Sequence, residues 1–206
     1  MVGPRDSALE HMLQCSQCDG LNPPEMSFCG RCAAPLSSEV ARRYGEDEAE
    51  RRQLTVLFCD IVESTRHASS MDPEEWRAVL RAYHQLCDEI ITPMRGHVAQ
   101  ILGDGLLVYF GYPVALEDAP RRAVLAGLAL VRNLPAAAIR IKLPRRTPRS
   151  VVINVRVGIH TGEVVVDRFG GSNPQPLAVG DTLNVAFRIQ SDAQTNTVVI
   201  TSVTQQ

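Results

Sequence analysis

The chain has 206 residues, of which 45% are hydrophobic and 21% are charged, so it can form a globular core and is neither wholly disordered nor fibrous. Its formal net charge of −2 provides no global basic field for nucleic acid or anionic lipid. The sequence contains no apolar run of about 18 residues and no signal-peptide pattern. We therefore expect a cytoplasmic protein without a membrane or nucleic-acid partner.

Four of the six cysteines cluster near the N-terminus, at Cys15, Cys18, Cys29 and Cys32. Two Cys-x-x-Cys pairs can form two knuckles that bring four thiolates to one tetrahedral zinc ion. The alternative is unligated thiols or redox pairs, but nothing else in this segment would order it. We predict a zinc ribbon over residues 1–36 with one structural Zn²⁺, followed by a polar linker over 37–52.

The remainder of the chain, residues 53–206, alternates strand-like and helical patterns. The clearest helix begins at Asp72-Pro73-Glu74-Glu75, which combines an N-cap, a proline and acidic residues in the first turn. Gly103-Asp104-Gly105 is a hairpin signal between two strand-like runs. The expected elements are strands over 54–59, 97–102, 106–110, 151–159, 163–166 and 197–201, and helices over 73–91, 117–133 and 182–190.

This order of elements indicates an α+β fold of the ferredoxin-like βαββαβ type, a sheet with helices on one face. The strands over 151–159 and 163–166 are expected to form a hairpin around Thr161-Gly162. The residues between the strand over 163–166 and the helix over 182–190 are expected to form a loop.

Two aspartates are candidate metal ligands because the fold places them at neighbouring strand ends. Asp60 ends the strand over 54–59, and Asp104 lies in the predicted hairpin turn. A pair of carboxylates with room for phosphate oxygens suits a hard cation such as Mg²⁺. Each residue also has a simpler explanation, Asp60 as a cap for the following segment and Asp104 as a turn residue.

Four segments together resemble, in order, the motifs of the class III nucleotidyl cyclases: FCDIVEST (58–65), LGDGLLVYFG (102–111), VRVGIHTGEV (155–164) and VGDTLNVAFR (179–188). The resemblance implies a homodimer that converts ATP into 3′,5′-cyclic AMP and pyrophosphate, with active sites at the dimer interface. It also implies two Mg²⁺ or Mn²⁺ ions per site, held by Asp60, Asp104 and the backbone carbonyl of Ile61. By the same resemblance, Asn184 orients the ribose and Arg188 meets charge on the transferring phosphorus, both supplied by the other protomer.

Gln100 departs from the pattern of the adenylate cyclases, which carry at this position a lysine that reads the adenine ring. By resemblance, Thr182 is its partner in base selection. A glutamine amide offers both a donor and an acceptor, so it suits guanine as well as adenine. The choice between ATP and GTP therefore stays open. The alternative function is a catalytically degenerate cyclase-like module that dimerises and binds nucleotide to regulate a neighbour.

Compared with the family, the sequence stops early, at Gln206. Cyclase domains normally continue past the strand over 197–201 with another helix and further strands. We therefore expect the catalytic domain over 53–206 to be incomplete at its C-terminus and to belong to a longer chain, which leaves room for downstream regulatory domains. The alternative is a trimmed domain.

Overall fold

The computed structural model describes residues 12–15, 19–24, 26–27, 29–31, 36, 50–141, 149–169 and 175–206. The chain divides into two compact units, residues 1–48 and residues 49–206. In the first unit, strands β1 (Leu13–Gln14) and β2 (Leu21–Asn22) pair antiparallel. The predicted linker residues 37–49 lie outside the described residues, and the first strand of the second unit begins within the predicted linker, at Glu50.

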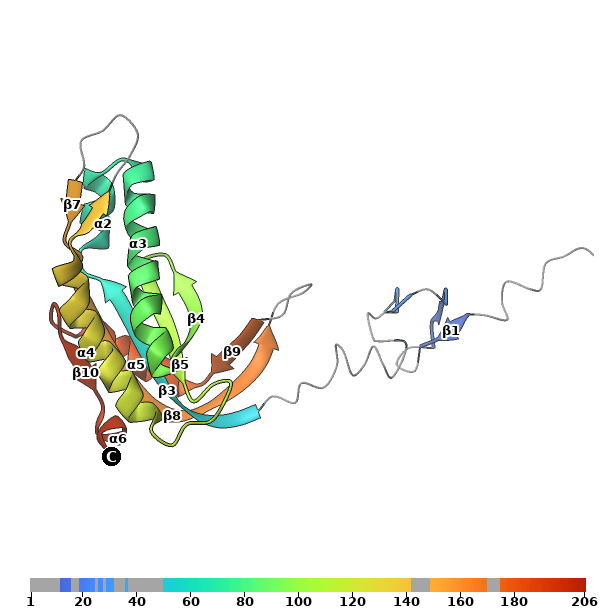
Figure 1. Ribbon diagram of the computed structural model, residues 1–206. Coiled ribbons are helices and arrows are strands. Elements are labelled where there is room, and N and C mark those ends of the chain that lie inside the picture. Colours follow the sequence, from blue (N-terminus) through green and yellow to red (C-terminus); the bar gives the residue numbers. More distant parts are fainter. Residues whose placement is uncertain are drawn as a thin grey trace, which may run out of the picture. The chain divides into compact units, whose positions relative to one another are not determined.

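The second unit contains the predicted α+β arrangement (Figure 1). Its strands are β3 (Glu50–Ile61), β4 (His97–Leu102), β5 (Gly105–Phe110), β6 (Ile139–Ile141), β7 (Arg149–Val151), β8 (Val155–Phe169), β9 (Gln175–Val179) and β10 (Val198–Ile200). Its helices are α2 (Ser64–Ser70), α3 (Pro73–Ile91), the 3₁₀ turn η1 (Thr92–Met94), α4 (Ala119–Ala137), α5 (Asp181–Ser191) and α6 (Ser202–Gln205).

The main sheet has the strand order β10-β8-β3-β5-β4, and β9 also pairs with β8. The four strands β8-β3-β5-β4 have the antiparallel neighbours and the crossover connections expected of a βαββαβ fold. The predicted N-cap of α3 is part of a capping box, in which Asp72 and Glu75 bond reciprocally at the first turn. The sequence signals for α3 and for the β4–β5 hairpin are therefore confirmed.

One face of the sheet, here called the covered face, packs against α3 and α4, which lie side by side in Figure 1. β3 directs alternate side chains to this face, because successive residues of a strand point to opposite sides. The large side chains of this core that are not exposed to solvent include Leu57, Tyr83, Ile91, Phe110 and Leu130. The covered face thus holds the main hydrophobic core of the unit.

The opposite face, here called the open face, packs against α5, so the prediction of helices on one face only was wrong. A smaller core lies here, formed by Leu54, Val56, Leu107, Tyr109, Val164, Val166, Ala178 and Ala186. Gly158 of β8 permits the approach of α5, since an added Cβ would lie 2.6 Å from the carbonyl oxygen of Ala186. The absence of a side chain at Gly158 therefore leaves the space in which α5 packs.

The predicted hairpin around Thr161-Gly162 was also wrong, because both residues lie inside the continuous strand β8. Thr161 pairs with Thr55 and Gly162 pairs with Leu54 along β3. The glycine serves packing rather than a turn, since a Cβ on Gly162 would lie 2.5 Å from the hydroxyl oxygen of Thr182. A Thr-Gly pair looks the same in the sequence whether it turns the chain or lets a helix approach.

The strand β9 lies in a segment predicted to be a loop. It contains Pro176, which lacks the N–H that a central strand needs but is tolerated where a strand pairs on one side only. Ala178 of β9 donates its backbone N–H to the hydroxyl oxygen of Tyr109, at 3.1 Å, and so attaches the strand to the open face. The last strand and α5 are found where they were predicted, within two residues.

Candidate active site

Asp60 and Asp104 meet at one end of the sheet. Asp60 is the second-last residue of β3, and Asp104 lies in the turn between β4 and β5. β3 and β5 pair through Cys59 and Leu106, which brings the turn against the end of β3. A Cβ added at Gly105 would lie only 3.7 Å from a carboxylate oxygen of Asp60. The sequence-based expectation that the two strand ends converge agrees with this geometry.

The carboxyl group of Asp104 is close enough to that of Asp60 to affect its protonation. Partial burial raises the pKa of Asp60, and the neighbouring Asp104 raises this pKa further through a hydrogen bond and through charge repulsion. Arg156 lowers the same pKa, but its effect is smaller. Two carboxylates that repel each other at a partly open strand end form a donor set suited to a hard divalent cation. Within the described residues, no cluster of three or more His, Cys, Asp or Glu side chains was found that could hold a metal.

Arg156 is part of this site, although no sequence motif assigned it a role of its own. It lies directly opposite Asp60 in the β3–β8 ladder. One of its guanidinium nitrogens, Nη2, is 3.3 Å from Oδ2 of Asp60, and Nη1 donates to the carbonyl of Ser191 at 3.1 Å. The role of Arg156 follows from the pairing register of β3 and β8, which lie far apart in the sequence. No local sequence pattern supplies that register.

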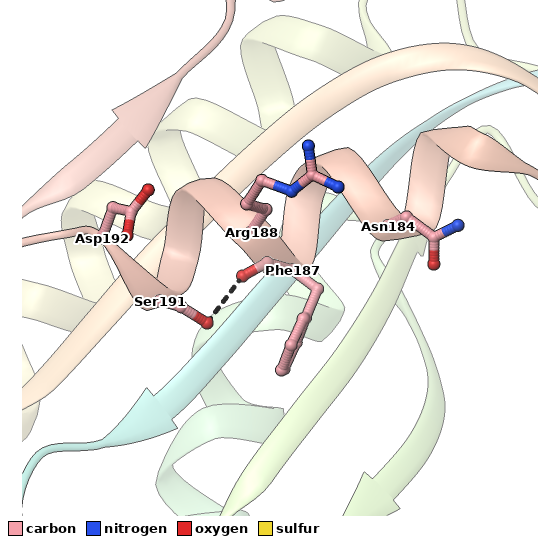
Figure 2. Close-up of a pocket in the computed structure, with 5 residues that line it drawn as sticks. All are labelled: Asn184, Phe187, Arg188, Ser191 and Asp192. Atoms are coloured by element: carbon pink, nitrogen blue, oxygen red, sulfur yellow. Dashed lines mark hydrogen bonds between the residues drawn. The ribbon is translucent and has the colours of Figure 1, made fainter.

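Asn184 and Arg188 project from the exposed side of α5 (Figure 2). Their spacing of four residues places them on one helix face, as predicted. They line an open groove of about 460 Å³ together with Phe187, Ser191 and Asp192. All five lining residues belong to α5 or follow it directly, so the chain's own carboxylate pair does not line this groove.

The two residues predicted to select the base occupy different environments. Gln100 is exposed on the edge strand β4, beside a register shift between Val98 and Gln100. Thr182 is only 5% exposed, and its hydroxyl donates to the carbonyl of Glu163 at 2.7 Å. The hydroxyl proton of Thr182 is therefore already used within the protein, whereas the amide of Gln100 faces solvent.

Of the four cysteines predicted to bind zinc, Cys15 and Cys29 are buried, while Cys18 and Cys32 lie outside the described residues. The backbone N–H of Arg31 donates to the sulfur of Cys29 at 3.4 Å. The buried side chain of Asn22 links the two cysteine-bearing loops. It donates to the carbonyl of Gly20 at 2.8 Å and accepts from the N–H of Gly30 at 2.9 Å.

Comparison with known proteins assigns the chain to a protein family. Residues 47–206 match the family described as the adenylate and guanylate cyclase catalytic domain. The chain belongs to this family. This match covers the whole sheet and both candidate halves of the active site. It agrees with the class III cyclase resemblance of the four sequence motifs.

Relatives of this cyclase domain include enzymes named for either nucleotide. The chain is 32% identical to adenylate cyclase 1 of Rhizobium meliloti over 148 residues, which cover 71% of this chain and 22% of that protein. It is 28% identical to the human guanylate cyclase soluble subunit beta-2 over 169 residues, which cover 80% of this chain and 26% of that protein. The chain therefore spans about a quarter of the length of these relatives.

Among solved structures, the cyclase domain resembles the guanylate cyclase domain of RhGC from Catenaria anguillulae, which was crystallised in complex with GTP. The TM-score is 0.68 with 27% sequence identity, over 77% of this chain and 83% of that one. Among the described residues of the cyclase, no helix is both long and apolar enough to cross a membrane.

Proposed function

We propose that this cyclase domain converts ATP into 3′,5′-cyclic AMP and pyrophosphate at sites shared between two copies of the chain. In this reaction the ribose 3′-oxygen attacks the α-phosphorus, the bond to the pyrophosphate oxygen breaks, and the 3′-hydroxyl proton is lost. The observation that carries the proposal is the division of functional groups. The carboxylates of Asp60 and Asp104 converge at one strand end, while Asn184 and Arg188 line a separate groove on α5.

Asp60, Asp104 and the backbone carbonyl of Ile61 would hold two Mg²⁺ or Mn²⁺ ions. The fit is supported by the raised pKa of Asp60, because part of that rise comes from the repulsion that a bound cation would relieve. When bound, such ions lower the pKa of the ribose 3′-hydroxyl and neutralise charge on the triphosphate. Asp60 and Asp104 serve to fix the ions at the strand end, where a triphosphate can reach them.

Arg188 and Asn184 act on the nucleotide itself. A guanidinium presents several N–H donors in one plane and can contact two phosphate oxygens at once, so Arg188 suits the charge that develops on the transferring phosphoryl group. Asn184, one turn earlier on the same exposed face, would bond to the ribose and orient its 3′-hydroxyl.

A second copy of the chain would bring these two halves together. Phe187 lies between Asn184 and Arg188 in the sequence of α5, and 57% of its surface is exposed. Its ring makes an edge contact with Phe58 of β3, with 5.6 Å between the ring centres. An exposed aromatic side chain beside catalytic groups favours a homodimer interface over this part of the open face.

The direct test is to supply the purified protein with Mn²⁺ and either ATP or GTP and to identify the products. We expect cyclic AMP and pyrophosphate from ATP, and a smaller yield of cyclic GMP from GTP. A protein that binds nucleotide but forms neither cyclic product would instead support the degenerate regulatory module. The observation favouring this second candidate is that Gln100 occupies the exposed β4 position where a lysine was expected.

Mixing two inactive variants tests the shared site. Asp60→Ala removes a metal ligand and Arg188→Ala removes the phosphate contact, so each homodimer is expected to be inactive. A mixed dimer retains one complete site and should recover part of the activity. If verified mixed dimers of folded variants show no recovery while the wild type is active, the site is not shared.

The N-terminal segment is proposed to hold one structural Zn²⁺ through Cys15, Cys18, Cys29 and Cys32. This is supported by the burial of Cys15 and Cys29 and by the N–H contact to the sulfur of Cys29. Elemental analysis of the full chain should give one zinc per chain, and Cys29→Ser should lose it. The variant Cys87→Ser alters a cysteine buried in the covered-face core and is the control that should keep the zinc.

A further inference from the structure

The helix α3 contacts both segments that carry the candidate metal ligands. Its consecutive residues Tyr83 and His84 each reach the residue immediately before one aspartate. The Tyr83 hydroxyl is 3.5 Å from the sulfur of Cys59, which precedes Asp60. The ring nitrogen Nε2 of His84 is 3.1 Å from the carbonyl oxygen of Gly103, which precedes Asp104.

The contact from Tyr83 lies within the covered-face core. Tyr83 is fully buried, and Cys59 is only 1% exposed. The thiol of Cys59 and the hydroxyl of Tyr83 form a hydrogen bond in which either group can be the donor. The side chain of Cys59 points toward α3, and Asp60, the next residue along the strand, points to the other face of the sheet.

The contact from His84 reaches the turn between β4 and β5, which carries Asp104. Gly103 has a positive φ of 70°, and a Cβ built on it would meet nothing within 4 Å. Its carbonyl oxygen can accept a hydrogen bond from Nε2 of His84 when this nitrogen carries the proton. His84 is half-buried, and its ring centre lies 5.2 Å from the ring centre of Tyr83. The imidazole of His84 is therefore packed beside a buried residue of the same helix.

We propose that Tyr83 and His84 are positioning residues that together fix the separation of the Asp60 and Asp104 carboxylates, and hence the affinity of the site for a divalent cation. The proposal rests on the proposed function of these aspartates. Two repelling carboxylates stay close only if other contacts hold their backbones. α3 is suited to this task because it is 19 residues long, is capped at its N-terminus and packs along the covered face.

The test measures Mn²⁺ binding by electron paramagnetic resonance, with and without 3′-deoxy-ATP, a nucleotide that lacks the attacking hydroxyl. Groups that hold metal ligands in place typically contribute 10–100-fold to metal affinity, so His84→Ala should weaken Mn²⁺ binding by about 10-fold. His84→Gln, which keeps a side-chain N–H donor, should recover most of this loss. Tyr83→Phe, which keeps the ring, should weaken binding by a smaller factor.

His97→Ala is the matched control. His97 is also half-buried and belongs to the same hairpin, but it lies at the far end of β4 and contacts the ring of Tyr112. The His97→Ala variant should bind Mn²⁺ with the same affinity as the wild type. Thermal unfolding of each variant without metal shows whether a change in binding reflects loss of the fold.

Wild-type Mn²⁺ affinity in both His84→Ala and Tyr83→Phe would overturn the positioning role. Equal weakening in His84→Ala, His84→Gln and His97→Ala, with lowered melting temperatures, would also overturn it, because this pattern indicates a general packing role. A different result would show that the proposed function of the aspartates, rather than the positioning role, has failed. If the wild type binds no Mn²⁺, or if Asp104→Ala binds it unchanged, the aspartates are not the metal ligands.

Discussion

On the covered face of the sheet, two long helices bury a continuous core, whereas on the open face α5 and β9 cover a smaller one and leave Phe187 exposed beside Asn184 and Arg188. The covered face is the larger source of hydrophobic stabilisation, because this contribution scales with the apolar area removed from water. The open face carries the exposed groups that can act on a nucleotide. Residues of similar type should therefore differ in effect according to the face on which they lie.

The largest expected effect is on catalysis. Arg188→Ala on the open face should lower kcat by about 10³-fold, because an arginine that stabilises a transferring phosphoryl group typically contributes at least this much. The side chain is exposed, so the melting temperature should stay within about 1 °C of the wild type, as for surface substitutions generally. Initial rates at saturating ATP measure the loss. Arg77→Ala, an exposed arginine on α3, is the control and should retain full activity.

The covered face should show the opposite behaviour. Leu130→Ala removes a fully buried side chain from α4 and should lower the free energy of unfolding by about 2–5 kcal/mol, with little change in kcat for the folded fraction. Leu128→Ala, two residues earlier on the same helix and 51% exposed, should change stability by less than about 0.5 kcal/mol. Urea unfolding gives both values. Equal effects at the two positions would contradict the burial assigned to α4.

A smaller effect is expected on nucleotide choice. Gln100→Lys places a cationic donor opposite the adenine N1 acceptor, where guanine presents an N–H. Gln100 is exposed in the structure, so the mispairing arises only when a bound purine covers this position. A mispaired donor that is then buried costs about 1–3 kcal/mol, so the ratio of kcat/KM for ATP to that for GTP should rise by roughly 10-fold. Steady-state rates with both nucleotides give this ratio. An unchanged ratio in an active, folded variant would show that Gln100 does not read the base.

The smallest effect concerns self-association. Phe187→Ser should weaken the dimer by about 1 kcal/mol, as expected when an exposed aromatic side chain is removed from an interface. Sedimentation velocity over a range of concentrations measures the dissociation constant. Leu125→Ser alters a side chain on α4 that is 43% exposed and should leave association unchanged. If Leu125→Ser weakens the dimer and Phe187→Ser does not, the interface lies on the covered side of the molecule.

Local sequence signals were sufficient for the parts of the fold that depend on neighbouring residues. The capping residues before α3, the Asp-Gly turn between β4 and β5 and the four-residue spacing of Asn184 and Arg188 all act within one or two turns of chain. The convergence of Asp60 and Asp104 followed from the order of the strands. The four cyclase motifs indicated the protein family, and the family match over residues 47–206 agrees with them.

The sequence by itself determined α3, the β4–β5 hairpin, α5 and the last strand, the end of the sheet at which the carboxylates gather, and the helix face that carries Asn184 and Arg188. Only the tertiary structure decided that Gly158 and Gly162 lie where α5 approaches β8, and that Gly162 is not in a turn. It also decided that Arg156 faces Asp60. These features depend on strand register and on close approach between segments distant in the chain, and such contacts leave no periodic pattern in the sequence.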